Sequence, residues 1–255
     1  MKKNTIYHKS CVPRMDEMED ESIHLIVTSP PYNVGIPYHE YLDNLPMVQY
    51  MHMLKLFMAE AMRVLVPGGR TCLNIANIGR TPYIPLATYC NIMALELGFL
   101  MRGEVVWNKG EASARGSTNM GTFKSCKNPV IRDCHEYILI YSKDSYDLDP
   151  RGYAECDITS QAFGDDAISI WNMGCSHNRE HPAAFPEELP RRCIEFYTAP
   201  GMNVLDPFMG SGTTAIAAFK SKRNFIGYEL DKYYVDMAMS RLGAEGFNTF
   251  DPMGW

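Results

Sequence analysis

Two short motifs hold the residue types in this chain that could do chemistry. The first is a proline turn directly after the apolar run 23–27, with the sequence Ser29-Pro30-Pro31-Tyr32. The Ser29 hydroxyl and the Ser29 and Pro30 carbonyls are hydrogen-bond acceptors outside any predicted helix or strand ladder, and the prolines make the turn rigid. Acceptors aimed at the N–H groups of an amine on an aromatic base would free its conjugated lone pair and favour the positive charge that develops during attack. The turn therefore predicts a site that activates such an amine, with Tyr32 as a flat surface for stacking the base.

The second motif is a glycine-rich turn between a predicted strand and a predicted helix, Asp206-Pro207-Phe208-Met209-Gly210-Ser211-Gly212-Thr213-Thr214. Such a turn lets a ligand approach the backbone closely, and the start of the helix offers unpaired N–H groups. Glu229 ends the next predicted strand, 17 residues after Gly212. In Rossmann-like sites an acid about 20 residues beyond the turn binds ribose hydroxyls. The third glycine of a dinucleotide-binding turn is absent, so the motif departs from that pattern.

Together, and in this order, the two motifs resemble the amino-group DNA methyltransferases, in the permuted class whose catalytic motif precedes the cofactor motif. The resemblance covers most of the chain and implies S-adenosylmethionine as the cofactor. It implies that Phe208 lies against the cofactor, that the glycines pass beside its methionine part, and that Glu229 holds its ribose. The segment 181–186 matches the helix-start segment of the family, which also flanks the methionine part. The cofactor-binding residues expected on this basis are Asp206, Phe208, Gly210, Ser211, Gly212, Thr213, Glu229, His181 and Phe185.

The target expected from this resemblance is the N4 amine of cytosine in a specific duplex sequence. A base inside a duplex cannot reach such a turn, so it must be flipped out. Methylation at cytosine C5 uses a cysteine, usually in a Pro-Cys pair, and this sequence contains no Pro-Cys. In the family, Ser-Pro-Pro-Tyr occurs mostly in cytosine-N4 enzymes, so Ser29 favours that base, with adenine N6 as the main alternative. The expected catalytic residues are Ser29, Pro30, Pro31 and Tyr32.

Other functions explain the two motifs less well. An NAD(P)-dependent oxidoreductase would need the missing third glycine and would leave Ser-Pro-Pro-Tyr unexplained. Methylation of a protein glutamine is associated with Asn-Pro-Pro-Tyr, and a non-catalytic DNA-binding module would not need both motifs intact. A metal site is not predicted, because the spacing of the candidate ligands matches no standard zinc module; these are Cys175, His177, His181 and Cys193.

The net charge of −6 does not by itself predict a nucleic-acid-binding protein. Local charge is more informative, because residues 108–132 carry basic side chains spaced by Gly, Ser and Asn, a composition suited to phosphate contacts and adaptable base readout. A long stretch without periodicity in a compact domain is usually functional or disordered. A second candidate insertion is 144–180, where the recognition region of the family often lies. The DNA-contacting residues expected are Lys109, Arg115, Asn119, Lys124 and Lys127.

The pattern of apolar residues predicts one α/β domain over 1–255, because strands alternate with helices. Strands are expected at 23–27, 71–76, 105–107, 137–141, 203–205 and 225–230. Helices are expected at 45–65, where 67–69 should stop the helix, and at 85–97, 186–197, 213–221 and 233–242. The resemblance implies a Rossmann-like S-adenosylmethionine-dependent methyltransferase sheet. It should be mostly parallel with one antiparallel strand, have helices on both faces and carry loop insertions for DNA.

Composition also bounds the setting. The eight cysteines are scattered without a C-x-x-C pair, which is typical of reduced thiols, and we expect a cytoplasmic protein without a signal peptide or membrane span. The expected partner is double-stranded DNA, with a cognate restriction endonuclease in a restriction–modification system. The protein itself is expected to be a monomer or a homodimer.

Overall fold

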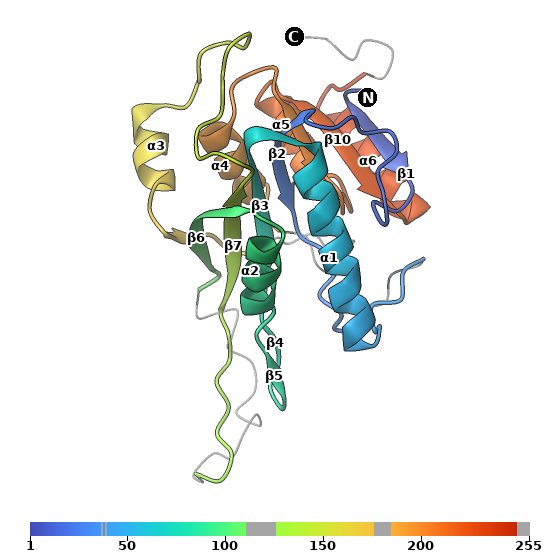
Figure 1. Cartoon of the computed structure of the whole chain (residues 1–255), viewed down its shortest axis with the longest axis vertical. Coiled ribbons are helices and arrows are strands. Elements are labelled where there is room, and N and C mark those ends of the chain that lie inside the picture. Colours follow the sequence, from blue (N-terminus) through green and yellow to red (C-terminus); the bar gives the residue numbers. More distant parts are fainter. Residues whose placement is uncertain (37, 39, 111–125, 176–184, 249–255) are drawn as a thin grey trace.

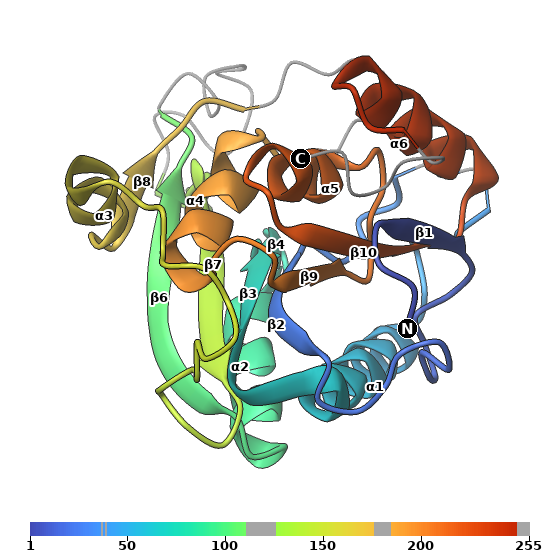
Figure 2. The same ribbon diagram turned by 90° about the horizontal axis from the view of Figure 1, so that it is seen from above.

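The computed structural model describes residues 1–36, 38, 40–110, 126–175 and 185–248. Their core is one eight-stranded sheet in the order β1-β10-β9-β2-β3-β7-β6-β8 (Figures 1 and 2). Every neighbouring pair is parallel except the two that contain β7. The mostly parallel sheet with a single antiparallel strand is therefore confirmed. The strands are β1 (Thr5–His8), β2 (Ile23–Thr28), β3 (Leu65–Ile75), β6 (Leu100–Asn108), β7 (His135–Ser142), β8 (Ile170–Asn172), β9 (Asn203–Asp206) and β10 (Asn224–Glu229).

Helices cover both faces of this sheet, as predicted (Figure 2). One face packs against α1 and α2, and the other packs against α4, α5 and α6. Every residue of β2 is buried; Ile23 and Ile26 enter one core, and Leu25 and Val27 enter the other. Such a continuous apolar run is typical of a parallel strand covered on both faces. The helices are α1 (Met47–Val64), α2 (Leu86–Glu96), α3 (Ser160–Asp166), α4 (Glu188–Tyr197), α5 (Thr213–Lys220) and α6 (Lys232–Ala244).

The segment 67–69 does not stop the first helix. α1 already ends at Val64, and β3 begins at the next residue and contains this segment. The pairing of β2 with β3 shifts here, from Ile23↔Leu65 to Leu25↔Arg70, which marks a bulge. Gly68 has a φ of +75°, and a Cβ placed on it would lie 2.0 Å from the Asp147 carbonyl oxygen. The glycine therefore allows close approach of another backbone segment.

Several short elements were not predicted from the sequence. They are β1, β8, α3 and a two-stranded hairpin of β4 (Ile78–Gly79) and β5 (Tyr83–Ile84). These elements are too short to give a periodic signal, and β1 and β8 are the two edges of the sheet. The start of α4 also differs from the prediction, because it begins at Glu188 and carries Pro190 in its first turn. Proline is tolerated there because the N–H groups of a first helical turn have no intrahelical acceptor.

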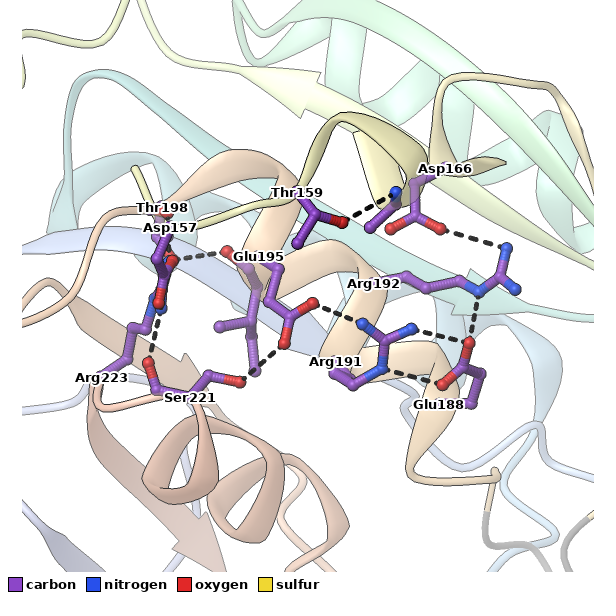
Figure 3. A network of polar contacts seen from close by, with 12 residues as sticks. Asp157, Thr159, Asp166, Glu188, Arg191, Arg192, Glu195, Thr198, Ser221 and Arg223 are labelled. Carbon is purple, nitrogen blue, oxygen red and sulfur yellow. Dashed lines mark hydrogen bonds and ion pairs between the residues drawn. The ribbon is translucent and has the colours of Figure 1, made fainter. Parts of the chain in front are cut away.

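The first part of the candidate insertion 144–180 is held by ion pairs to Arg223 and to α4 (Figure 3). The fully buried Arg223 donates to both oxygens of Asp157, at 2.9 and 2.7 Å, and to the Thr198 carbonyl. Arg192 of α4 pairs with Asp166 of α3 at 3.1 Å. Arg223 directly precedes β10, so the Asp157 contact lies at the opposite end of that strand from Glu229.

The later part of this insertion returns to the other end. β8 pairs with Val106–Asn108 at the carboxyl end of β6, and Trp107 donates from its indole N–H to the Met173 carbonyl at 2.9 Å. The insertion therefore runs from one end of the sheet to the other. Within the described part of the chain, no helix is both long enough and apolar enough to span a bilayer.

We predict that Asp157→Ala lowers the free energy of unfolding by about 3 kcal/mol, because it leaves the buried Arg223 charge without its carboxylate. Urea denaturation followed by circular dichroism measures this change. The matched control is Asp149→Ala, since the Arg151 partner of Asp149 is 90% exposed and an ion pair in solvent contributes little to stability. Equal losses in the two variants would contradict the structural role of the Asp157–Arg223 pair.

Candidate functional site

The two sequence motifs line one cavity of about 420 Å³. Ser29 and Tyr32 of the proline turn face it, and so do Phe208, Gly210 and Glu229. The motifs meet because β2 pairs with β9, and β9 pairs with β10, all in parallel. The carboxyl ends of these strands therefore lie at one edge of the sheet, which is where open α/β sheets bind ligands.

Asp206 connects the two motifs through hydrogen bonds of its buried side chain. It is buried and does not line the cavity. Its carboxylate accepts hydrogen bonds from the Thr28 hydroxyl at 2.5 Å, the Thr214 hydroxyl at 2.7 Å and the Phe208 backbone N–H at 3.1 Å. Burial raises the pKa of Asp206 to about 6, against the effect of these hydrogen bonds. Asp206 thus fixes the geometry of both turns without facing the cavity.

The end of the glycine-rich turn packs against α6. Gly212 has a φ of +82°, and a Cβ on it would lie 2.7 Å from Ala238 Cβ. Arg241 donates to the carbonyl and hydroxyl oxygens of Ser211, at 2.5 and 2.9 Å, and to the Thr213 hydroxyl at 3.3 Å. Of the residues 210–213, only Gly210 lines the cavity. A side chain at position 212 would therefore meet α6 first.

Glu229 lies on the cavity wall beside Gly210. One carboxylate oxygen accepts the Gly210 N–H at 2.7 Å, and the other accepts the Asp231 N–H at 2.8 Å. Burial raises the pKa of Glu229. Each carboxylate oxygen has a second lone-pair direction beyond these contacts, so the group can still accept hydroxyl protons from a ligand.

Aromatic side chains missed by the sequence analysis line the same cavity. Tyr38 and Tyr41 come from the loop after the proline turn, and Tyr234 comes from α6. The Tyr38 and Tyr234 rings meet edge to face, with centroids 6.3 Å apart. The buried Asp43 holds this loop by accepting three backbone N–H bonds, from Asn33, Val34 and Ile36. Neither these three tyrosines nor the hydrogen bonds of Asp43 could be predicted from a local sequence pattern.

Beside the proline turn, on the wall of the same cavity, lies a polar network that the sequence analysis also missed. Tyr32 places its hydroxyl 2.9 Å from Ser29 Oγ and donates to Glu136 Oε2 at 3.0 Å. Asn74 Nδ2 donates to Tyr32 Oη at 2.9 Å and to Glu136 Oε2 at 2.7 Å. Lys109 pairs with the other oxygen of Glu136. The available signal was a polar residue inside an apolar strand, Asn74 in β3 and Glu136 in β7.

The residues expected to contact DNA divide into three groups. Lys109 faces the cavity, with its ammonium on Glu136 and 4.6 Å from the centroid of the Trp107 ring. Lys127 is exposed. A more open hollow of about 520 Å³ adjoins the cavity across Tyr32 and Glu136, and it is also lined by Arg80 and His135. The remaining expected residues, Arg115, Asn119 and Lys124, lie outside the described part of the chain.

The other expected site residues are placed as follows. Phe185 is buried and lines the cavity, whereas His181 lies outside the described residues. Of the cysteines considered for a metal, Cys175 borders the cavity and Cys193 is buried in the core. Among the described residues, no group of three or more His, Cys, Asp or Glu side chains is arranged so that it could hold a metal ion.

Comparison with known proteins is consistent with this arrangement. The chain matches the model of a family described as DNA methylase over residues 23–240. The Type II methyltransferase M.MjaI of Methanocaldococcus jannaschii is 32% identical to it, with 90% of this chain and 88% of the relative covered. The Type II methyltransferase M.BglII of Bacillus subtilis is 27% identical, with 95% and 69% covered.

A solved structure has the same architecture over most of its length. The Thermus thermophilus protein TTHA0409, proposed to be a DNA modification methylase, aligns with a TM-score of 0.71 and 28% identity over 90% of each chain. The structure of that protein in complex with S-adenosyl-L-methionine aligns with a TM-score of 0.69 and 27% identity, over 94% of this chain and 92% of that one.

We predict that Asp206 makes folding stability depend on pH. Its pKa is higher in the folded chain than the ordinary value of 3.8, so its contribution is fully present below that value and is lost as pH rises through about 6. Asp206→Asn cannot titrate, so its stability relative to the parent should fall by about 1 kcal/mol between about pH 7.5 and pH 5. Urea denaturation of both proteins at the two pH values measures this. A difference that does not change with pH would show that the pKa of Asp206 is not raised.

Proposed function

This chain belongs to the DNA methylase family whose model it matches, and we propose that it transfers a methyl group from S-adenosylmethionine to the N4 amine of cytosine in duplex DNA. The observation that carries the proposal is the single cavity lined by both the Ser29 turn and the Glu229 turn. A methyl donor and an acceptor base bound to these two walls would share one cavity. Holding two reactants in such a space is itself a large part of catalysis.

The residues of the Glu229 wall fit the proposed cofactor. The cavity volume lies within the range of pockets for ligands of this size. When bound, the cofactor supplies an electrophilic methyl group on its sulfonium. The Glu229 carboxylate would accept the ribose hydroxyls, Gly210 would allow close approach of the backbone, and Phe208 and Tyr38 would pack against the apolar parts. The S-adenosyl-L-methionine complex of the Thermus relative supports this assignment.

The proline turn would act on the amine of a flipped-out base. Ser29 Oγ and the Pro30 carbonyl would accept its two N–H protons, which draws the nitrogen toward tetrahedral geometry and stabilises the positive charge that forms on it. Tyr32 would stack on the base, and its hydroxyl contacts hold the ring in place. The neutral hydroxyl of Ser29, typical of cytosine-N4 enzymes in this family, supports cytosine as the base.

Transfer would be direct, without a covalent bond between protein and base. Cys11 and Cys175 are the cysteines among the described residues that line the cavity. Burial raises the pKa of the Cys11 thiol, which disfavours the thiolate that attack on a pyrimidine ring would require. The names of the Type II relatives support a site-specific reaction on duplex DNA, with a cognate restriction endonuclease as the expected functional partner.

We predict that DNA methylated by the purified protein contains N4-methylcytosine. Tritiated S-adenosylmethionine and duplex DNA are incubated with the protein, and the digested nucleosides are separated and identified by mass spectrometry. If the product is N6-methyladenine, the target base is adenine and not cytosine, and 5-methylcytosine would refute amine methylation.

Ser29→Ala should lower the single-turnover methylation rate about 100-fold or more, with unchanged affinity for DNA and cofactor, since it removes one preorganised contact to the amine.

We also predict that Glu229→Ala weakens S-adenosylmethionine binding about 10- to 100-fold, because it leaves ribose hydroxyls without an acceptor, a loss of about 1–3 kcal/mol. Isothermal titration calorimetry measures the affinity. The matched control is Glu96→Ala, which removes an exposed carboxylate from α2. Circular dichroism establishes that both variants are folded. Equal affinity in the Glu229 variant and the parent would remove this residue from the cofactor site.

A further inference from the structure

Glu136 lies beside the proline turn on the wall of the same cavity, and the methyl transfer proposed above gives its carboxylate no task. We propose that Glu136 is a positioning residue that fixes the direction of the hydrogen bonds beside the turn, so that Ser29 Oγ presents its lone pairs to the target amine. This inference rests on the proposed function and assigns that site a residue outside both sequence motifs. The decisive property is the direction in which each proton of the network points.

Three donors converge on the Glu136 carboxylate, whose side chain is 12% exposed. They are Asn74 Nδ2 at 2.7 Å, the Tyr32 hydroxyl at 3.0 Å and the Lys109 ammonium. A carboxylate has no proton to give, so each neighbour must donate toward it. Glu136 therefore acts as the fixed negative end of the network.

The Tyr32 hydroxyl has one proton, and Glu136 is its best acceptor. The competing acceptors are the backbone carbonyl of Asn74, at 3.4 Å, and the Ser29 hydroxyl, at 2.9 Å. Both are neutral, and a bond to a charged acceptor is the stronger one. Burial, together with the Glu136 charge, raises the pKa of Tyr32, so the proton stays on the hydroxyl. With its proton donated to Glu136, Tyr32 Oη can take part in other hydrogen bonds only as an acceptor.

The direction of the Ser29 bond follows from this. Ser29 Oγ lies 2.9 Å from Tyr32 Oη, and Tyr32 has no second proton, so Ser29 must be the donor. The two protons of Asn74 Nδ2 point to Glu136 and Tyr32. Asn74 therefore has no proton left to donate to Ser29 Oγ, which lies 3.4 Å from Nδ2. The lone pairs of Ser29 Oγ are thus available to an amine in the cavity.

The orientation of the Asn74 amide supports the same directions of the hydrogen bonds. Its amide nitrogen faces Glu136 and Tyr32, whereas its Oδ1 is buried and has no hydrogen-bond partner. Leaving a buried acceptor unpaired is unfavourable. The opposite amide orientation would place that oxygen against the Glu136 carboxylate, so the charge on Glu136 explains the arrangement. Lys109 balances this charge from the far side, over the Trp107 ring.

Two substitutions test the inference by removing different parts of the chain of bonds. Glu136→Gln keeps the shape of the side chain. If the oxygen of the new amide stays on Lys109, its nitrogen, which is a donor, faces the Tyr32 hydroxyl in place of the acceptor. Tyr32→Phe keeps the stacking ring and removes the hydroxyl. Each should lower the single-turnover methylation rate about 10- to 100-fold, while calorimetric affinity for S-adenosylmethionine and the affinity for duplex DNA stay within about twofold of the parent. Tyr89→Phe, on the exposed side of α2, is the matched control.

The double variant with Glu136→Gln and Tyr32→Phe discriminates further. If Glu136 acts on Ser29 through the Tyr32 hydroxyl, the second substitution adds little, and the double variant should have nearly the rate of Tyr32→Phe alone. Parental rates in either single variant, or fully additive losses in the double variant, would overturn the proposal. So would loss of rate accompanied by an equal loss of cofactor or DNA affinity.

These outcomes are separable from failure of the proposed function. If the parent protein methylates no DNA, the proposed function itself is refuted. If the parent is active and the Glu136 and Tyr32 variants match it, only the positioning role is refuted. An adenine product would change the proposed base but not the interpretation of the variants, because both amines donate N–H protons to Ser29 in the same way.

Discussion

The hydrogen bond from the Thr28 hydroxyl to the Asp206 carboxylate is the contact on which the geometry of the site depends. It joins the last residue of β2 to the last residue of β9, where both strands leave the sheet. The ladder between these strands ends earlier, at the pair Ile26↔Leu205. Because Asp206 also accepts from Phe208 and Thr214, one buried carboxylate sets the start of both turns.

This arrangement buries two carboxyl groups in surroundings that disfavour their charged form. Burial raises the pKa of both Asp206 and Glu229. Replacing buried charged groups by apolar ones is often neutral or stabilising. At these two positions it would leave the backbone N–H groups of Phe208, Gly210 and Asp231 without their acceptors. The rigidity of the glycine-rich turn therefore depends on groups that are themselves costly to bury.

The single antiparallel strand explains how the opposite wall of the cavity is built. In a parallel sheet, only carboxyl ends of strands reach the ligand edge. β7 runs the other way, so its amino end lies at that edge, and Glu136 near its start comes beside Asn74 near the end of β3. The pairing Trp107↔Glu136 brings in β6, which ends just before Lys109. The network beside Tyr32 therefore rests on three adjacent strands and their register.

The sequence by itself determined the two motifs, the α/β class and the existence of the long helices and the central strands, because turn chemistry and apolar periodicity are local properties. It also identified Ser29 and Glu229, which line one cavity. Only the tertiary structure decided that Lys109 faces this cavity, that Asn74 and Glu136 lie beside Tyr32, and which residues of the glycine-rich turn contact α6. Those contacts join residues far apart in the chain. They depend on strand order and register, which no local pattern specifies.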